Sequence, residues 1–213
     1  MATSSVVKDG YGPTLPDLVA RLPRGLQWLA KAAGVALLLL ALGWVLFGRD
    51  VGVERVIVKE PVAFNLGYRA PFQKIEPRGD EILRLEGGGQ EFVITPLSLP
   101  KYDGYAAGFL PYYSTRLAAQ MERARPGLTV RGEGRVSINK FGGYELQYDV
   151  READGTKRYG RRLLLLPDDF AREGVQLWLE ADASAAVVNP ESPGRTGPLK
   201  TALRSFRFGT DVP

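Results

Sequence analysis

The stretch GYELQYDVREADGTKRYGRRLLLLP, residues 143–167, decides the fold class of this chain. Apolar and polar residues alternate on either side of Asp154-Gly155, a dipeptide that favours a two-residue hairpin turn. A turn centred on this dipeptide places Tyr148 opposite Arg161. The stretch therefore predicts an antiparallel β-hairpin. Its two expected strands are residues 143–152 and 157–167.

This register gives the hairpin one side that faces the core and one that faces solvent. The inward set is Tyr144, Leu146, Tyr148, Val150, Tyr159, Arg161, Leu163 and Leu165. The outward set is Glu145, Gln147, Asp149, Arg151, Arg158 and Arg162. Arg161 is then a guanidinium on the apolar side, where its stem packs on Tyr148 and Tyr159 or its head binds an anion. Residues 163–166 are apolar on both sides, which predicts a central strand covered on both faces.

Further strands and two helices are expected on either side of this hairpin. The expected strands are residues 53–58, 63–68, 82–86, 91–97, 128–139 and 174–182. The expected helices are residues 112–125 and 196–204, the second with Pro198 near its first turn. The run Gly87-Gly88-Gly89 is expected to be a turn between two strands, because no helix follows it and no Lys-Ser/Thr pair completes a phosphate loop.

This order of elements resembles the PsbP-like fold. Four segments carry the resemblance: Phe64-Asn65-Leu66-Gly67-Tyr68, Ala70-Pro71-Phe72, Gly142-Gly143-Tyr144-Glu145-Leu146 and Leu203-Arg204-Ser205-Phe206-Arg207-Phe208. The fold is shared by the photosystem protein PsbP, the Ran-binding Mog proteins and the LpqN-type lipoproteins. The resemblance implies an α+β domain, an α/β/α sandwich around a central antiparallel sheet. It also implies a binding or assembly role, which is common among members of this fold.

Residues 26–48 are expected to form a single transmembrane helix. The segment AAGVALLLLALGWVLFG, residues 32–48, carries no charge. A helix that begins at Leu26 is about 33 Å long, which matches a hydrocarbon core of about 30 Å. The alternative, a cleaved signal peptide, is disfavoured because no small-x-small pattern follows the apolar run. The segment therefore predicts an uncleaved signal anchor in place of the lipid anchor of the lipoprotein members.

Basic residues on the two sides of this segment predict its orientation. Arg21, Arg24 and Lys31 lie on the near side, whereas Arg49 and Arg55 on the far side alternate with acidic residues. Loops rich in Lys and Arg stay in the cytoplasm. The expected location is the cell membrane, with the N-terminus cytoplasmic and the C-terminal domain extracytoplasmic. The expected organisation is a cytoplasmic tail (1–25), a transmembrane helix (26–48), a linker (49–61), a PsbP-like domain (62–209) and a short tail (210–213).

Composition excludes several kinds of chemistry. The chain has 28 Lys and Arg residues against 24 Asp and Glu residues, and neither Cys nor His. Disulfides, Cys/His zinc sites, thiol nucleophiles and Ser-His-Asp triads are therefore excluded. Most of the net charge of +4 lies within residues 1–49, so the rest of the chain lacks the basic face that a nucleic-acid partner requires. Asp168-Asp169 is expected to cap a turn, and we expect no metal and no cofactor.

The candidate ligand-binding residues come from two regions. They are Tyr102, Asp103 and Tyr105 in a tyrosine-rich loop, and Tyr148, Tyr159 and Arg161 on the hairpin. The favoured function is a non-catalytic extracytoplasmic binding or assembly module with an envelope or membrane-complex protein as partner. The alternatives are a carboxylate-based envelope hydrolase and a structural subunit of a larger membrane complex. A deep pocket at the tyrosine loop favours ligand binding, and a large exposed apolar patch favours a structural subunit.

Overall fold

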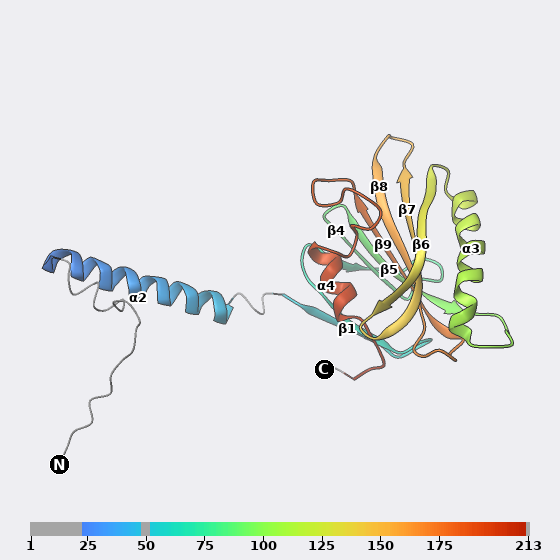
Figure 1. The fold of residues 1–213 in the computed structure, drawn as a ribbon, viewed down its shortest axis with the longest axis horizontal. Helices are drawn as coiled ribbons and strands as arrows, with labels where there is room; N and C mark the ends of the chain where they lie inside the picture. The colour runs from blue at the N-terminus through green and yellow to red at the C-terminus, as the bar shows by residue number, and fades with distance from the viewer. Residues whose placement is uncertain (1–22, 48–51, 212–213) are drawn as a thin grey trace, which may run out of the picture. The chain divides into compact units, whose positions relative to one another are not determined.

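The computed structural model describes residues 23–47 and 52–211, and the chain divides into two compact units, 1–51 and 52–213. In the first unit, helix α2 (Arg24–Phe47) occupies the segment expected to be helical (Figure 1). Among the described residues, no helix is both long enough and apolar enough to cross a membrane. Most of the expected cytoplasmic tail, residues 1–22, and the start of the linker, residues 48–51, lie outside the described residues.

The second unit contains a large antiparallel sheet with the strand order β3-β4-β5-β9-β8-β7-β6. Its strands are β3 (Gln73–Ile75), β4 (Leu83–Gly87), β5 (Gln90–Ser98), β6 (Leu128–Ile138), β7 (Phe141–Arg151), β8 (Lys157–Leu165) and β9 (Glu173–Asp182). A small sheet has the order β1-β2-β10, formed by β1 (Glu54–Val58), β2 (Phe64–Tyr68) and β10 (Arg207–Phe208). The helices are α3 (Ala106–Ala124) and α4 (Gly197–Ser205).

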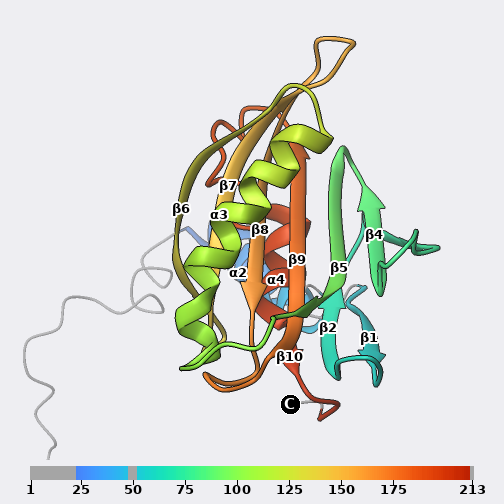
Figure 2. The same ribbon diagram turned by 90° about the vertical axis from the view of Figure 1, so that its right-hand side faces the viewer.

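The two faces of the large sheet carry different covers, as Figure 2 shows. Helix α3 packs on β6 and β7 on one face, with a core that includes Leu146 and Leu164. On the other face, α4 and the small sheet cover a core that includes Leu163, Leu177 and Phe64. The expected α+β sandwich with a central antiparallel sheet is therefore present. The structure differs from the expected sandwich in one layer, which contains the three-stranded sheet β1-β2-β10 beside α4.

Strand β8 lies between β7 and β9 in the middle of the large sheet, and it has the two-sided apolar pattern expected of a central strand. Leu163 and Leu165 belong to the core beneath α4, whereas Leu164 and Leu166 belong to the core beneath α3. All four side chains are at most 2% exposed. A run of consecutive leucines is required here because successive side chains of a strand point to opposite faces.

The predicted register of the β7–β8 hairpin is wrong by one residue. Tyr148 pairs with Gly160, not with Arg161, and Arg151 pairs with Lys157. The amide of Gly155, a residue with φ +86°, donates to the carbonyl of Glu152, and the amide of Glu152 donates to the carbonyl of Thr156. This is a three-residue loop with glycine in the left-handed region, not a two-residue turn. The odd loop length shifts the register by one and exchanges the faces of β8 relative to β7.

Helix α3 begins at Ala106, six positions before the expected start at Tyr112, and includes Pro111. Proline removes one helical hydrogen bond, which is why the sequence indicated a loop up to this position. The amide of Ala107 donates to the carbonyl of Asp169 at 3.2 Å, so a neighbouring loop satisfies one of the free N–H groups at the helix start. The tyrosine-rich loop is correspondingly shorter than expected.

Two local predictions are confirmed, and one boundary changes. Gly88 and Gly89 have φ of +61° and +68° and connect β4 to β5 in a two-residue hairpin turn. Asp168 caps its turn, because its Oδ1 accepts the amides of Phe170 and Ala171 at 2.8 Å. The compact unit begins at Gly52, before the expected domain boundary, because β1 pairs with β2.

Candidate functional site

The six predicted site residues lie in three separate places. Tyr102, Asp103 and Tyr105 are exposed in the segment before α3. Tyr148 is fully buried beneath α3. Tyr159 and Arg161 lie on the opposite face of the sheet, on the α4 side, with Lys157 Nζ 4.7 Å from the Tyr159 ring centroid. The structure therefore does not bring these six residues together.

Arg161 is buried and already has a carboxylate partner. Its Nε and Nη2 donate to Oε2 of Glu145 at 3.0 and 2.5 Å, and its Nη1 donates to the carbonyl of Pro193 at 3.1 Å. The arginine is 8% exposed. All three kinds of guanidinium nitrogen are thus occupied by groups of the chain itself. Arg161 therefore holds the loop that contains Pro193 against β8, and its charge is already matched by Glu145.

Arg162 lies on the side of β8 that Tyr148 shares, the side that the sequence assigned to Arg161. It pairs with Leu146 and Trp178 in the neighbouring strands, on the side of β8 that carries Leu164. Its guanidinium lies over the indole of Trp178, 4.1 Å from the ring centroid, and its Nε donates to Gln176 Oε1 at 2.9 Å. Burial lowers the pKa of Arg162, and charge interactions with Tyr148, Tyr113 and Asp80 only partly offset this. The expectation that Arg162 lies on the solvent-facing side is therefore wrong.

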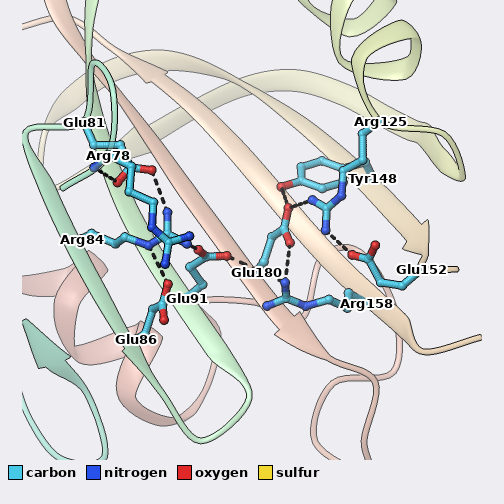
Figure 3. Close-up of polar contacts among 10 residues, drawn as sticks. All are labelled: Arg78, Glu81, Arg84, Glu86, Glu91, Arg125, Tyr148, Glu152, Arg158 and Glu180. Carbon is cyan, nitrogen blue, oxygen red and sulfur yellow. Dashed lines mark hydrogen bonds and ion pairs between the residues drawn. The ribbon is translucent and has the colours of Figure 1, made fainter. Parts of the chain in front are cut away.

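A chain of ion pairs crosses the part of this face formed by β4, β5, β8 and β9 (Figure 3). Glu180 on β9 is its centre and is 4% exposed. Its Oε1 accepts Arg125 Nη1 at 2.6 Å and the hydroxyl of Tyr148 at 2.8 Å, and its Oε2 lies 3.1 Å from Arg158 Nη1. Burial, followed by the charge of Glu180, raises the pKa of Tyr148 well above its ordinary value. Tyr148 therefore stays protonated and donates to this carboxylate.

The network continues on both sides of Glu180. Arg125 also pairs with Glu152, and these two carboxylates raise its pKa although burial alone lowers it. At the other end, Arg84 contacts Glu91, Glu81 and Glu86. Three arginines, Arg84, Arg125 and Arg158, thus face six carboxylates: Glu81, Glu86, Glu91, Glu152, Glu180 and Asp182. The network, named here the Glu180 network, has an excess of negative charge.

Two adjoining cavities lie along this face. One, of about 200 Å³, lies against α3 and is lined by Leu117, Gln120, Met121, Ala124, Arg125, Leu128, Arg162 and Trp178. The other, of about 250 Å³, is lined by Arg84, Glu91, Val93, Arg125, Trp178 and Glu180. They share Arg125 and Trp178, so an apolar cavity opens beside a charged one. Sequence reasoning missed these residues, although alternation in residues 174–182 does place Trp178 and Glu180 on one side of their strand.

A third feature is a group of exposed aromatic rings at the start of α3. Tyr102 contacts Phe109, which contacts Tyr112, with centroids 5.0 and 5.2 Å apart. Tyr105 contacts Phe170 from the loop after β8, at 5.1 Å. Tyr102, Tyr105, Tyr112 and Phe170 are 43%, 63%, 59% and 71% exposed. These four residues and Phe109 are named here the aromatic patch.

Comparisons with known proteins identify the fold. No model of a known protein family matches the sequence, and no curated protein does. The solution structure of cyanobacterial PsbP (CyanoP) from Synechocystis is similar, with a TM-score of 0.52 and 12% sequence identity over 76% of this chain and 95% of that protein. A Pseudomonas aeruginosa protein of unknown function, PA94, gives a TM-score of 0.34 and 15% identity over 61% of this chain and 83% of that one.

The similarity to cyanobacterial PsbP covers nearly all of that protein, so the chain contains a domain with a PsbP-like fold. The expectation based on the order of strands and helices is thereby confirmed. At 12% identity the comparison establishes the fold alone, because folds host unrelated functions. The weaker similarity to PA94 carries no argument.

Proposed function

We propose that this chain is a non-catalytic binding or assembly module, anchored in the cell membrane by residues 26–48, with its PsbP-like domain on the extracytoplasmic side. The fold supports the module, because binding and assembly roles are common among proteins that share it. The sequence supports the anchor, because residues 32–48 carry no charge and a helix that begins at Leu26 would be about 33 Å long, enough for a hydrocarbon core of about 30 Å. The excess of Lys and Arg before this segment supports the orientation.

The aromatic patch is the observation that carries the assembly role. Exposed Tyr and Phe side chains are enriched where proteins meet, since each ring buries a large apolar area at a small cost in side-chain entropy. Contacts among the rings already restrict their rotamers, which reduces that cost further. Exposed charges of both signs, Lys101, Asp103 and Arg172, lie within two residues of these rings in the sequence. Exposed rings with polar neighbours fit a protein partner in the envelope or in a membrane complex.

The carboxylate-hydrolase alternative receives less support. Two catalytic carboxylates must face a common substrate position, with one of them free to exchange a proton. Glu91 and Glu180, the acids that line the charged cavity, are each paired with two arginines. Both carboxylates are therefore held in ion pairs by arginines of the chain itself.

Photocrosslinking in cells tests the assembly role. A photoreactive phenylalanine analogue replaces Tyr105 or Phe170 in the full chain, and a third variant carries it at Val188, which is exposed to 61% outside the patch. We expect one discrete adduct with another protein from each patch position and none from Val188. The absence of adducts at both patch positions, with normal amounts of folded chain, would contradict the proposal.

Cysteine labelling tests the anchor separately. The chain contains no Cys, so a cysteine introduced at Thr210 or at Ser4 is unique. We expect a membrane-impermeant thiol reagent to label the Thr210 variant in intact cells, and the Ser4 variant only after permeabilisation. The opposite pattern would overturn the extracytoplasmic location, and recovery of the chain without detergent would overturn the anchor.

A further inference from the structure

The cavity between α3 and strands β8 and β9 combines an apolar wall with a cation. Leu117, Met121 and Ala124 of α3, together with Leu128, form the apolar side. Arg162 and Trp178, which are paired neighbours in the sheet, line the same cavity. Its volume is about 200 Å³, equivalent to roughly seven water molecules at about 30 Å³ each. A molecule of eight to ten non-hydrogen atoms is of this order of size.

Arg162 differs from three other arginines of the domain. Arg84, Arg125 and Arg161 each have a carboxylate within 4.0 Å, whereas for Arg162 no such partner occurs among residues 23–47 and 52–211. Its one hydrogen bond in this part of the chain runs from Nε to the neutral amide of Gln176. Buried charges are normally paired, because removing a charge from water costs several kcal/mol. A partly buried cation in a cavity, with no carboxylate within 4.0 Å among the described residues, is a favourable position for the negative charge of a ligand.

Trp178 adds a second unsatisfied donor at the same place. Its indole Nε1 is buried and has no acceptor in the part of the chain that the structure describes. Buried indole N–H groups usually find a partner. An anion next to Arg162 provides an acceptor for this donor, and the indole ring provides an apolar surface beside it. The two deficits, one of charge and one of hydrogen bonding, are therefore met by one kind of ligand.

We propose that this cavity binds a small organic monocarboxylate, with its carboxylate on the terminal nitrogens of Arg162 and its apolar part against Leu117, Met121 and Leu128. One guanidinium matches one carboxylate in both charge and geometry. A dianion such as phosphate fits less well, because the adjoining Glu180 network has more carboxylates than arginines. This site is separate from the aromatic patch, so it goes beyond the assembly role and each proposal can fail without the other.

Calorimetric titration of the full chain with hexanoate, hexanol and phosphate tests the site. Hexanoate and hexanol share their chain length but not the charge. Hydrogen bonds to a charged group are worth enough that we expect hexanoate to bind about tenfold more tightly than hexanol, or better. With Trp28→Phe and Trp44→Phe, Trp178 is the remaining tryptophan, and its fluorescence should change along the same saturation curve.

Two matched variants locate the binding. Arg162→Met should abolish hexanoate binding, whereas Arg195→Met, which removes the same charge from a side chain that is 64% exposed, should leave it unchanged. If Arg162→Met does not fold, Leu117→Trp fills the cavity while the charge stays, and it should abolish binding equally. The proposal is overturned if hexanoate shows no saturable binding, binds no better than hexanol or phosphate, or still binds to the folded Arg162→Met or Leu117→Trp variant.

Discussion

Arg161 and Arg162, neighbours on β8, offer a stringent test of the structure, because the same substitution should have different effects at the two positions. Arg161 lies on the α4 side in an ion pair with Glu145, and Arg162 lies on the α3 side without a carboxylate partner in the described part of the chain. Replacement by Met keeps much of the stem and removes one charge in both cases. The two variants therefore have the same composition and net charge, and they differ only in the environment of the lost guanidinium.

The expected magnitudes follow from what each substitution leaves behind. Arg161→Met leaves the Glu145 carboxylate, 13% exposed, without its cation, and breaking a buried pair in this way costs about 3 to 5 kcal/mol. Gln147 still donates to Glu145 at 2.8 Å and partly stabilises its charge. We therefore expect a loss of stability at the lower end of this range, about 3 kcal/mol. Arg162→Met loses one hydrogen bond, about 1 kcal/mol, and a cation–π contact of about 1 to 2 kcal/mol. It also removes a desolvated charge, so we expect a net change within about 1 kcal/mol.

Equilibrium unfolding of the full chain in urea, followed by circular dichroism, measures this difference. With a slope of about 2 kcal/mol per molar urea, the midpoint of Arg161→Met should fall by about 1.5 M, and that of Arg162→Met by less than about 0.5 M. Equal losses of stability in the two variants would refute the pairing argument. A larger loss for Arg162→Met would show that the two side chains occupy the opposite faces, as in the register predicted from the sequence.

Two further predictions concern tyrosines packed in the sheets. Gly160→Ala should destabilise the domain by about 1 to 3 kcal/mol in the same urea assay, since the added Cβ would lie 2.2 Å from Cζ of Tyr148. Gly134→Ala should leave the stability unchanged, because a Cβ at this position has no heavy atom within 4 Å. Equal effects of the two substitutions would contradict the close packing of Tyr148 on Gly160. Burial and the hydrogen bond to Glu54 raise the pKa of Tyr68 to about 12, so the folded state holds this proton more tightly than the unfolded state does. The free energy of unfolding should therefore be independent of Tyr68 below about pH 10 and fall by about 1.4 kcal/mol per pH unit from there to about pH 12. Tyr68→Phe should remove that decline. The same decline with pH in the Tyr68→Phe variant would contradict the raised pKa of Tyr68.

Local patterns were sufficient to predict most of the elements of this domain. The strands alternate because one side of each contacts a core, and Leu163–Leu166 is apolar throughout because β8 has a core on both sides. The turn predicted at Gly87-Gly88-Gly89 forms at Gly88 and Gly89, where two residues with positive φ connect antiparallel strands. The start of α3 was missed because it depends on a hydrogen bond from Ala107 to Asp169, which is distant in the sequence.

The hairpin register shows where local patterns become ambiguous. Asp154-Gly155 fits a two-residue turn with both residues at positive φ, and it fits equally a three-residue loop with glycine alone in that region, which the structure has. The two loops differ by one residue in register, and Arg161 and Arg162 are adjacent. Either register therefore places an arginine beside Tyr148, and the sequence offers no means of choosing between them.

By itself, the sequence determined the α+β class, the succession of strands and helices, the absence of thiol and histidine chemistry, and the presence of a long apolar segment, because each of these depends on residue type and spacing along the chain. The tertiary structure alone decided which arginine is paired and which is not. It also decided that Arg125 pairs with Glu180, that Arg158 and Glu91 connect Glu180 to Arg84, and that Arg162 and Trp178 share a cavity. These residues come from β4, β5, β8, β9 and the end of α3. Their distances depend on strand order, loop length and helix packing, which are set by contacts between segments far apart in the chain.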